Sequence, residues 1–249
     1  MNRRDLIDAL GPAAGEEAEL EAKFLLETSR GEAWLRQAVE RRLNGEPLQY
    51  ILGEWEFMGL PFLVGPQALI PRQDTETLCE AALRWLKNRP GARVLDLCCG
   101  SGCIGVSLAK LGGAQVTFAD ISPEALSLAM RNTERNGVAG SFYESDLFAV
   151  VPGLYELIAC NPPYLTAAEI ASGQKELTYE PVLALYGGED GLDFYRRLAA
   201  EWASHAVPGG VLLMEIGCAQ GAAVQELFPG ATICKDIRGL DRVAWVERI

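Results

Sequence analysis

The hydrophobic residues of the first fifty positions recur at intervals of three and four, the spacing of one face of an α-helix. Turn-forming pairs or single glycines at Gly11-Pro12, Gly31 and Asn44-Gly45 separate the periodic stretches. No alternating strand pattern occurs here, so we expect a small helical domain over residues 1–50. The periodic sets are Leu6/Ile7/Leu10, Leu20/Phe24/Leu25 and Trp34/Leu35/Ala38/Val39/Leu43.

The pattern changes between residues 50 and 70, where β-forming aromatic and branched residues lie between turn signals. Tyr50, Ile51 and Trp55 precede the turn at Gly59-Leu60-Pro61, and Phe62 follows it. We interpret residues 51–70 as a β-hairpin that links the helical domain to the rest of the chain. A helix should follow, capped by Asp74 or Thr75 and ending near Lys87.

From residue 92 onward, short apolar runs alternate with helical patterns. Such alternation predicts parallel strands in an open α/β sheet, here spanning residues 71–249. The last two runs, joined by Gly239-Leu240-Asp241, indicate an antiparallel hairpin at the sheet edge. The expected strands are 92–97, 115–119, 141–144, 155–160, 211–216, 232–235 and 242–248, and the expected helices are 103–111, 123–136, 191–205 and 219–227.

Composition narrows the possible classes of protein. Hydrophobic residues make up 49% of the 249-residue chain and charged residues 22%, as in an ordinary globular protein. No apolar run is long enough for a transmembrane helix, and the N-terminus lacks the apolar stretch of a secretory signal. We therefore expect a monomeric cytoplasmic protein with no membrane segment.

Charge and cysteine content disfavour two kinds of site. The net charge of −12 makes the surface repel polyanions, so DNA is disfavoured as the main partner. Seven cysteines occur with a single histidine, and the cluster Cys98-Cys99-x3-Cys103 lacks the usual C-x2-C pairing of a zinc site. We predict no metal site.

A glycine turn follows the predicted strand at 92–97 and opens a helix, which is typical of nucleotide-binding sites. Asp120 ends the next strand, where a carboxylate can accept both ribose hydroxyls. Asp96 stands where a dinucleotide-binding turn has glycine, and it would repel a pyrophosphate. The positively charged sulfonium and ammonium groups of S-adenosylmethionine suit the Asp96 carboxylate better than a pyrophosphate does. The simpler alternative is that Asp96 only caps the turn. Asp146 and Leu147, after the third strand, are placed to contact the adenine, or serve only as turn residues.

Asn161-Pro162-Pro163-Tyr164 follows the fourth strand, at the crevice where open α/β sheets bind ligands. An amide nitrogen is a poor nucleophile because its lone pair is conjugated with the carbonyl group. Breaking this conjugation costs on the order of the 18–20 kcal/mol rotation barrier. The Asn161 side-chain oxygen and the Pro162 carbonyl can accept both N–H groups and turn the lone pair toward a methyl donor. The prolines stiffen the loop, and the Tyr164 ring can stack on a planar NH2-bearing group.

Together these segments resemble the HemK/PrmC family, the protein-(glutamine-N5) methyltransferases of peptide chain release factors. The resemblance covers nearly the whole chain. The segments that carry it are Glu46–Gly53, Glu56–Gly59, Leu69–Glu76, the Asn-Pro-Pro-Tyr motif, Tyr179-Glu180-Pro181, Gly187–Leu192 and Asp241-Arg242-Val243.

The resemblance implies a Rossmann-like class I methyltransferase that methylates the glutamine of a Gly-Gly-Gln motif in class I release factors, supporting translation termination. The helical domain would dock the release factor. The substrate glutamine would be held by Asn161, Pro162, Pro163 and Tyr164. The implied contacts to S-adenosylmethionine are Thr75, Asp96, Cys98, Cys99, Gly100, Ser101, Gly102, Asp120, Asp146, Leu147 and Asn161.

One position departs from the family pattern, because Cys98 stands where the family turn usually begins with glycine. We expect Cys98 to keep a negative φ and to contribute only its backbone.

Two other functions share parts of this pattern. An N6-adenine DNA methyltransferase also carries Asn-Pro-Pro-Tyr, but the acidic charge and the lack of a target-recognition segment disfavour it. A non-catalytic adaptor could keep the fold, but such copies tend to lose part of the cofactor and acceptor set, which is complete here.

Overall fold

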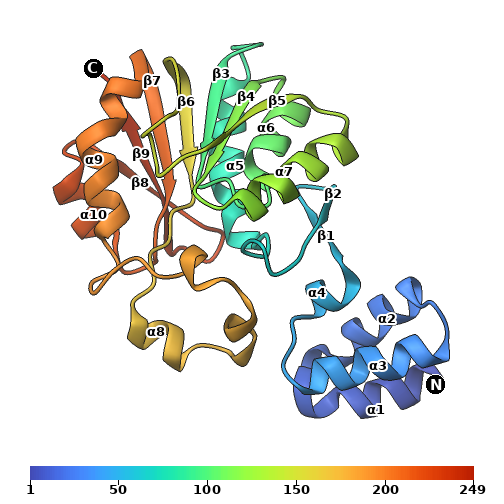
Figure 1. Ribbon diagram of the computed structural model, residues 1–249. Coiled ribbons are helices and arrows are strands. Elements are labelled where there is room, and N and C mark those ends of the chain that lie inside the picture. Colours follow the sequence, from blue (N-terminus) through green and yellow to red (C-terminus); the bar gives the residue numbers. More distant parts are fainter.

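The computed structural model describes all 249 residues, and its first 52 residues form four helices (Figure 1). These helices are α1 (Arg3–Ala14), α2 (Ala18–Thr28), α3 (Glu32–Leu43) and the short α4 (Leu48–Leu52). They bury a core of their own, which includes Leu6, Leu10 and Leu25. A buried ion pair between Glu21 and Arg42, 2.9 Å apart, joins α2 to α3. Its cost of desolvation is offset by the paired hydrogen bonds of the guanidinium.

The hairpin that follows is shorter than expected and consists of β1 (Glu54–Phe57) and β2 (Leu60–Leu63). Tyr50 and Ile51, interpreted from the sequence as strand residues, lie in α4 instead. Pro47 stands before this helix, and Gly53 ends it in the left-handed conformation, a common C-terminal signal. Phe57 and Phe62 of the hairpin pack into the main core.

The rest of the chain forms a seven-stranded sheet in the order β5-β4-β3-β6-β7-β9-β8. The first five strands in this order are parallel, and β9 runs antiparallel to both of its neighbours. The predicted closing hairpin is confirmed, but only β8 lies at the edge. The strands are β3 (Arg93–Leu97), β4 (Gln115–Asp120), β5 (Gly140–Glu144), β6 (Tyr155–Cys160), β7 (Ala206–Glu215), β8 (Thr232–Lys235) and β9 (Asp241–Glu247).

Helices cover both faces of the sheet (Figure 1). One core contains residues from α5, α6 and α7 together with alternate strand residues such as Val94 and Phe118. The other contains residues from α9 and α10 together with the intervening strand residues, such as Leu95 and Ile158. This alternation is the side-chain period of a strand buried on both faces. The helices are α5 (Gln73–Leu86), α6 (Cys103–Gly112), α7 (Pro123–Asn136), α9 (Asp193–His205) and α10 (Gly221–Leu227).

Strand β7 begins at Ala206, five residues before the predicted start, so Pro208-Gly209-Gly210 lies within the strand. Two other local features also differ from the prediction. The N-cap of α5 is Arg72, so Asp74 and Thr75 lie inside the first turn and do not cap it. The segment 167–184, for which no structure was predicted, forms α8 (Ala167–Ser172) and two 3-10 helices, Lys175–Tyr179 and Val182–Ala184. No helix in the structure has the length and apolar character needed to cross a membrane.

Candidate active site

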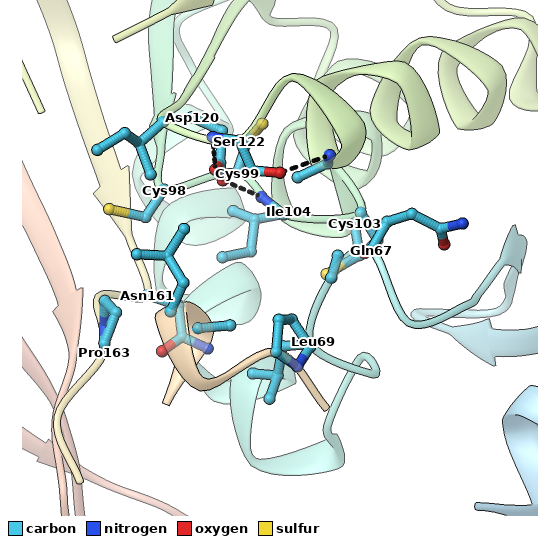
Figure 2. Close-up of a pocket in the computed structure, with 18 of the residues that line it drawn as sticks. Gln67, Leu69, Cys98, Cys99, Cys103, Ile104, Asp120, Ser122, Asn161 and Pro163 are labelled. Atoms are coloured by element: carbon cyan, nitrogen blue, oxygen red, sulfur yellow. Dashed lines mark hydrogen bonds between the residues drawn. The ribbon is translucent and has the colours of Figure 1, made fainter. Parts of the chain in front are cut away.

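A pocket opens at the carboxyl ends of β3, β4 and β6, with about 1110 Å³ of free space including its mouth. The chain continues from β3 to β4 and β5 on one side, and returns to β6 on the other. This is the switch point at which open α/β sheets bind their ligands. Figure 2 shows Asp120 and Ser122 at one end of the pocket and Asn161 and Pro163 at the other.

The glycine turn forms one wall of the pocket. Cys98, Cys99, Gly100 and Ser101 line it, whereas Gly102 lies behind and begins α6 with a φ of 77°. A Cβ at Gly102 would lie 3.0 Å from the Ala129 Cβ, so this glycine permits close packing of α6 on α7.

Asp120 lies beside this turn and is held by backbone donors. The Gly100 N–H donates to Oδ2 over 2.8 Å and the Ser122 N–H to Oδ1 over 2.9 Å (Figure 2). Burial raises the pKa of Asp120, and the bonds from Ser122 and Gly100 oppose that rise. Each carboxylate oxygen keeps a free lone pair toward the pocket, so the pair can accept two neighbouring hydroxyls.

Cys98 has a φ of 57°, so the expectation of a negative φ was wrong. Leu147, on the same pocket, has a φ of 49°. The left-handed region costs an L-residue roughly 1–2 kcal/mol, which explains why glycine suits the position of Cys98. Backbone strain of this kind clusters at functional sites.

Asp96 is fully buried and does not line the pocket. Its Oδ2 accepts from the Gly105 N–H over 2.8 Å, and its Oδ1 has no hydrogen-bond partner. Burial raises the pKa of Asp96 well above its ordinary value. The carboxyl therefore braces the start of α6 from beneath the glycine turn, whereas the sequence suggested direct contact with a cation.

Asp146 and Leu147 lie at the far wall of the pocket. Leu147 is buried, while Asp146 is half exposed and pairs with Arg197 of α9 over 2.8 Å. Phe194 and Arg197 also line the pocket, so α9 contributes a ring and a cation that the sequence did not reveal.

A wall that was not predicted comes from residues 67–72 together with Pro181, Leu183 and Ala184. The buried Glu180 joins the two segments, accepting from the Ile70 N–H over 3.0 Å and from the Arg72 guanidinium. Burial raises the pKa of Glu180, and the charge of Arg72 opposes this. Both segments belong to motifs noted in the sequence, but neither spacing nor periodicity showed that they meet.

The Asn-Pro-Pro-Tyr loop leaves β6 at the opposite end of the pocket from Asp120. The Asn161 Nδ2 donates to Thr75 Oγ1 over 3.3 Å, and Thr75 is buried in the first turn of α5. The amide group is thereby fixed with its oxygen free to accept. Asn161, Pro163 and Thr75 line the pocket, while Pro162 is buried beside them.

Tyr164, whose ring the sequence suggested would stack on the substrate, does not line this pocket. Its hydroxyl donates to Oε1 of Glu215, the last residue of β7, over 3.1 Å. Burial, followed by the charge of Glu215, raises the pKa of Tyr164. Glu215 was missed in the sequence, although an acid that ends an apolar strand is a recognisable signal of this sheet edge.

The loop is braced from behind by the glycine-rich segment 187–191. The Gln220 Nε2 donates to the Tyr164 carbonyl over 3.1 Å and to the Gly191 carbonyl over 3.2 Å. A Cβ at Gly187 would lie 2.6 Å from the Tyr164 Cα. Only glycine permits this approach, so the segment positions the loop.

Comparison with known proteins agrees with this architecture. The methyltransferase small domain family matches residues 74–177, and the PrmC N-terminal domain family matches residues 28–53. Among solved structures, a methyltransferase from Pyrococcus furiosus superposes with a TM-score of 0.57 at 21% identity, covering 77% of this chain and 89% of that one. The 16S rRNA N2 G1207 methyltransferase of T. thermophilus, in complex with AdoMet and guanosine, gives 0.58 at 19% identity, covering 79% and 50%. These similarities establish the class I methyltransferase fold.

Sequence relatives define the family more narrowly. The chain is 45% identical over 216 residues to the release factor glutamine methyltransferase of Geobacter sulfurreducens, covering 84% of this chain and 75% of that protein. It is 42% identical over 223 residues to that of Koribacter versatilis, covering 87% and 80%. The similarity runs through both the helical domain and the sheet domain. This chain belongs to the family of release factor glutamine methyltransferases.

Proposed function

We propose that this protein transfers a methyl group from S-adenosylmethionine to the side-chain nitrogen (N5) of the glutamine in the Gly-Gly-Gln motif of class I release factors. The observation that carries the proposal is the fixed Asn161 amide, whose nitrogen is held by Thr75 and whose oxygen is free to accept. A site for a carboxamide substrate needs such an acceptor, because the substrate nitrogen brings two donors.

The residues of the pocket fit S-adenosylmethionine. Asp120 offers two acceptor oxygens for ribose hydroxyls, and Leu147 offers an apolar surface for adenine beside the exposed Asp146. Asp96 lies beneath the turn and supports it from behind, so the backbone of residues 98–101 is the part of the turn that faces the cofactor. When bound, the cofactor supplies an electrophilic methyl carbon attached to sulfur.

The chain's own groups then act by orientation. Asn161 Oδ1 and the Pro162 carbonyl each accept one N–H of the substrate amide, which turns the nitrogen lone pair toward the methyl carbon. The bound cofactor would supply the methyl group and keep the C–S electron pair as a neutral thioether. The methylated nitrogen would then be cationic and would release one proton to solvent water, so no strong base is needed. Proximity and orientation can contribute roughly 7–11 kcal/mol.

The helical domain is proposed to dock the release factor, and the protein is proposed to act as a monomer without binding DNA. The Tyr179 hydroxyl, at the segment beyond the substrate loop, donates to the Asn44 carbonyl over 3.1 Å. Arg42 also pairs with Glu176 over 2.7 Å. These contacts connect the helical domain to the wall of the pocket.

The direct test is mass spectrometry of a class I release factor after incubation with this protein and S-adenosylmethionine. We expect one added methyl group on the glutamine of the Gly-Gly-Gln peptide, and none in a factor with that glutamine changed to alanine. Labelling of DNA, with no change in the release factor, would contradict the proposal.

A further inference from the structure

Glu215 is a buried carboxylate with no role in the chemistry described so far. It is 2% exposed at the end of β7, behind the Asn-Pro-Pro-Tyr loop, and it does not line the pocket. Burying an ionisable group costs several kcal/mol unless other groups compensate. A costly acid this close to a reactive loop is a candidate functional residue.

Glu215 is not needed as the counter-ion of the nearby buried Arg242. That guanidinium pairs with Asp74 over 3.0 Å and with Asp236 over 3.5 Å, and it forms no salt bridge with Glu215. Both partners lie outside β7. The charge of Arg242 still favours the ionised Glu215, but hydrogen bonds to this carboxylate come from its other neighbours.

Those neighbours are two hydroxyl groups of the site. Tyr164 donates to Oε1 over 3.1 Å, whereas Oε2 is buried and makes no hydrogen bond of regular geometry. Burial raises the pKa of Glu215, and the hydroxyl groups of Thr75 and Tyr164, which face the carboxylate, oppose that rise. Thr75 supplies the second side-chain hydroxyl that faces the Glu215 carboxylate, while Oε2 itself forms no hydrogen bond in the structure.

Donor and acceptor counts fix the direction of the resulting chain. A carboxylate only accepts, so any hydrogen bond between these two groups must use the single hydroxyl proton of Thr75. The Thr75 oxygen then accepts from Asn161 Nδ2, as observed. A reversed Asn161 amide would place its oxygen beside Thr75 and its NH2 toward the substrate. The NH2 groups of Asn161 and of the substrate amide, both donors, would then face each other.

We propose that Glu215 is a positioning residue for methyl transfer: through Thr75 it sets the orientation of the Asn161 amide, and through Tyr164 it anchors the far end of the loop. The inference rests on the proposed function. It assigns to one carboxylate the task of keeping the Asn161 oxygen available for the substrate.

Glu215→Gln tests the inference, because glutamine keeps the shape but replaces one acceptor oxygen with a donor. We expect the single-turnover rate of release-factor methylation to fall on the order of 10–100-fold, as for a small misplacement of a reacting group. The cofactor dissociation constant and the KM for the release factor should stay at wild-type values. Glu226→Gln, an exposed change on α10, is the matched control and should keep the wild-type rate.

A double-mutant cycle separates positioning from a general loss of structure. Tyr164→Phe removes one of the two donors, so Glu215→Gln should reduce the rate less in that background than in the wild type. Any of three results would overturn the inference. These are an unchanged rate in Glu215→Gln, a rate loss in the double variant equal to the product of the two single losses, and a rate loss matched by weaker cofactor binding. If Glu215→Gln does not fold, Tyr164→Phe decides, since an unchanged rate in that variant would overturn it.

The wild-type protein distinguishes this result from a failure of the proposed function. A wild type that leaves the release factor unmethylated refutes the proposed function itself. If the wild type is active and Glu215→Gln methylates the release factor at the same rate, only the role of Glu215 is refuted.

Discussion

Gly191 offers a sharp test of how the substrate loop is held in place. Its φ is 74°, and an added Cβ would lie 2.4 Å from the Tyr164 carbonyl oxygen and 2.7 Å from the Gln220 Nε2. Gly209 has nearly the same φ, 75°, but an added Cβ there would meet nothing within 4 Å. Comparing the two alanine variants therefore separates the cost of backbone conformation from the cost of displacing the loop.

The conformational cost is about 1 kcal/mol for alanine in the left-handed region, and it applies to both variants. Gly191→Ala should add about 1 kcal/mol for the disrupted hydrogen bond from Gln220 to Tyr164, and about 1–3 kcal/mol for crowding. We thus expect Gly209→Ala to lower the free energy of unfolding by about 1 kcal/mol and Gly191→Ala by about 3–5 kcal/mol.

Urea denaturation measures both free energies, and single-turnover methylation measures the effect on the loop. Under conditions where both variants are folded, Gly191→Ala should lose on the order of 100-fold in rate, while Gly209→Ala keeps the wild-type rate. Equal destabilisation of the two variants, or an unimpaired Gly191→Ala enzyme, would refute the view that the 187–191 segment positions the loop.

Four further variants test the glycine turn and the two acids beside it. Asp120→Ala should raise the dissociation constant of S-adenosylmethionine roughly 10–100-fold by removing charged acceptors from the ribose, and calorimetry that finds no change would remove this residue from the site. The raised pKa of Asp96 means that the folded protein binds this proton more tightly than the unfolded chain. The stability that Asp96 contributes is therefore complete below its ordinary pKa of 3.8 and is lost as the pH rises through the raised value. Unfolding measured from acid to neutral pH should show this loss in the wild type, at up to about 1.4 kcal/mol per pH unit, but not in Asp96→Asn, and parallel curves would contradict the assignment. Cys98→Gly should change the free energy of unfolding by less than about 1 kcal/mol, because relief of strain offsets added chain entropy, whereas Cys98→Val should be less stable than the wild type by about 1–2 kcal/mol; the opposite ranking in denaturant melts would argue against the strained turn.

The sequence predicted the sheet well because its central strands, β3, β6 and β7, are buried on both faces and appear as short apolar runs. Helix α7 and strand β6 have the predicted bounds. Helix α4 was missed because Tyr50 and Ile51 favour strands in isolation, while its five residues are held by burial against α2 and α3. Tertiary packing decides such short segments.

The lining of the pocket was predictable where a residue ends or directly follows a strand, as Asp120 and Asn161 do. It was not predictable where the role depends on which neighbour a side chain meets. Asp96 lies close to the glycine turn in sequence, yet it faces Gly105 beneath the turn and not the pocket. The left-handed backbone of Cys98 is likewise set by the surrounding turn and leaves no sign in the residue itself.

The central claim is that Asn161 orients the substrate amide without being needed to hold the cofactor. The most direct measurement compares wild type and Asn161→Ala by single-turnover methylation of a release factor, alongside calorimetry with S-adenosylmethionine. The account predicts a largely unchanged dissociation constant and no detectable transfer to the glutamine. Transfer at the wild-type rate by Asn161→Ala would contradict it.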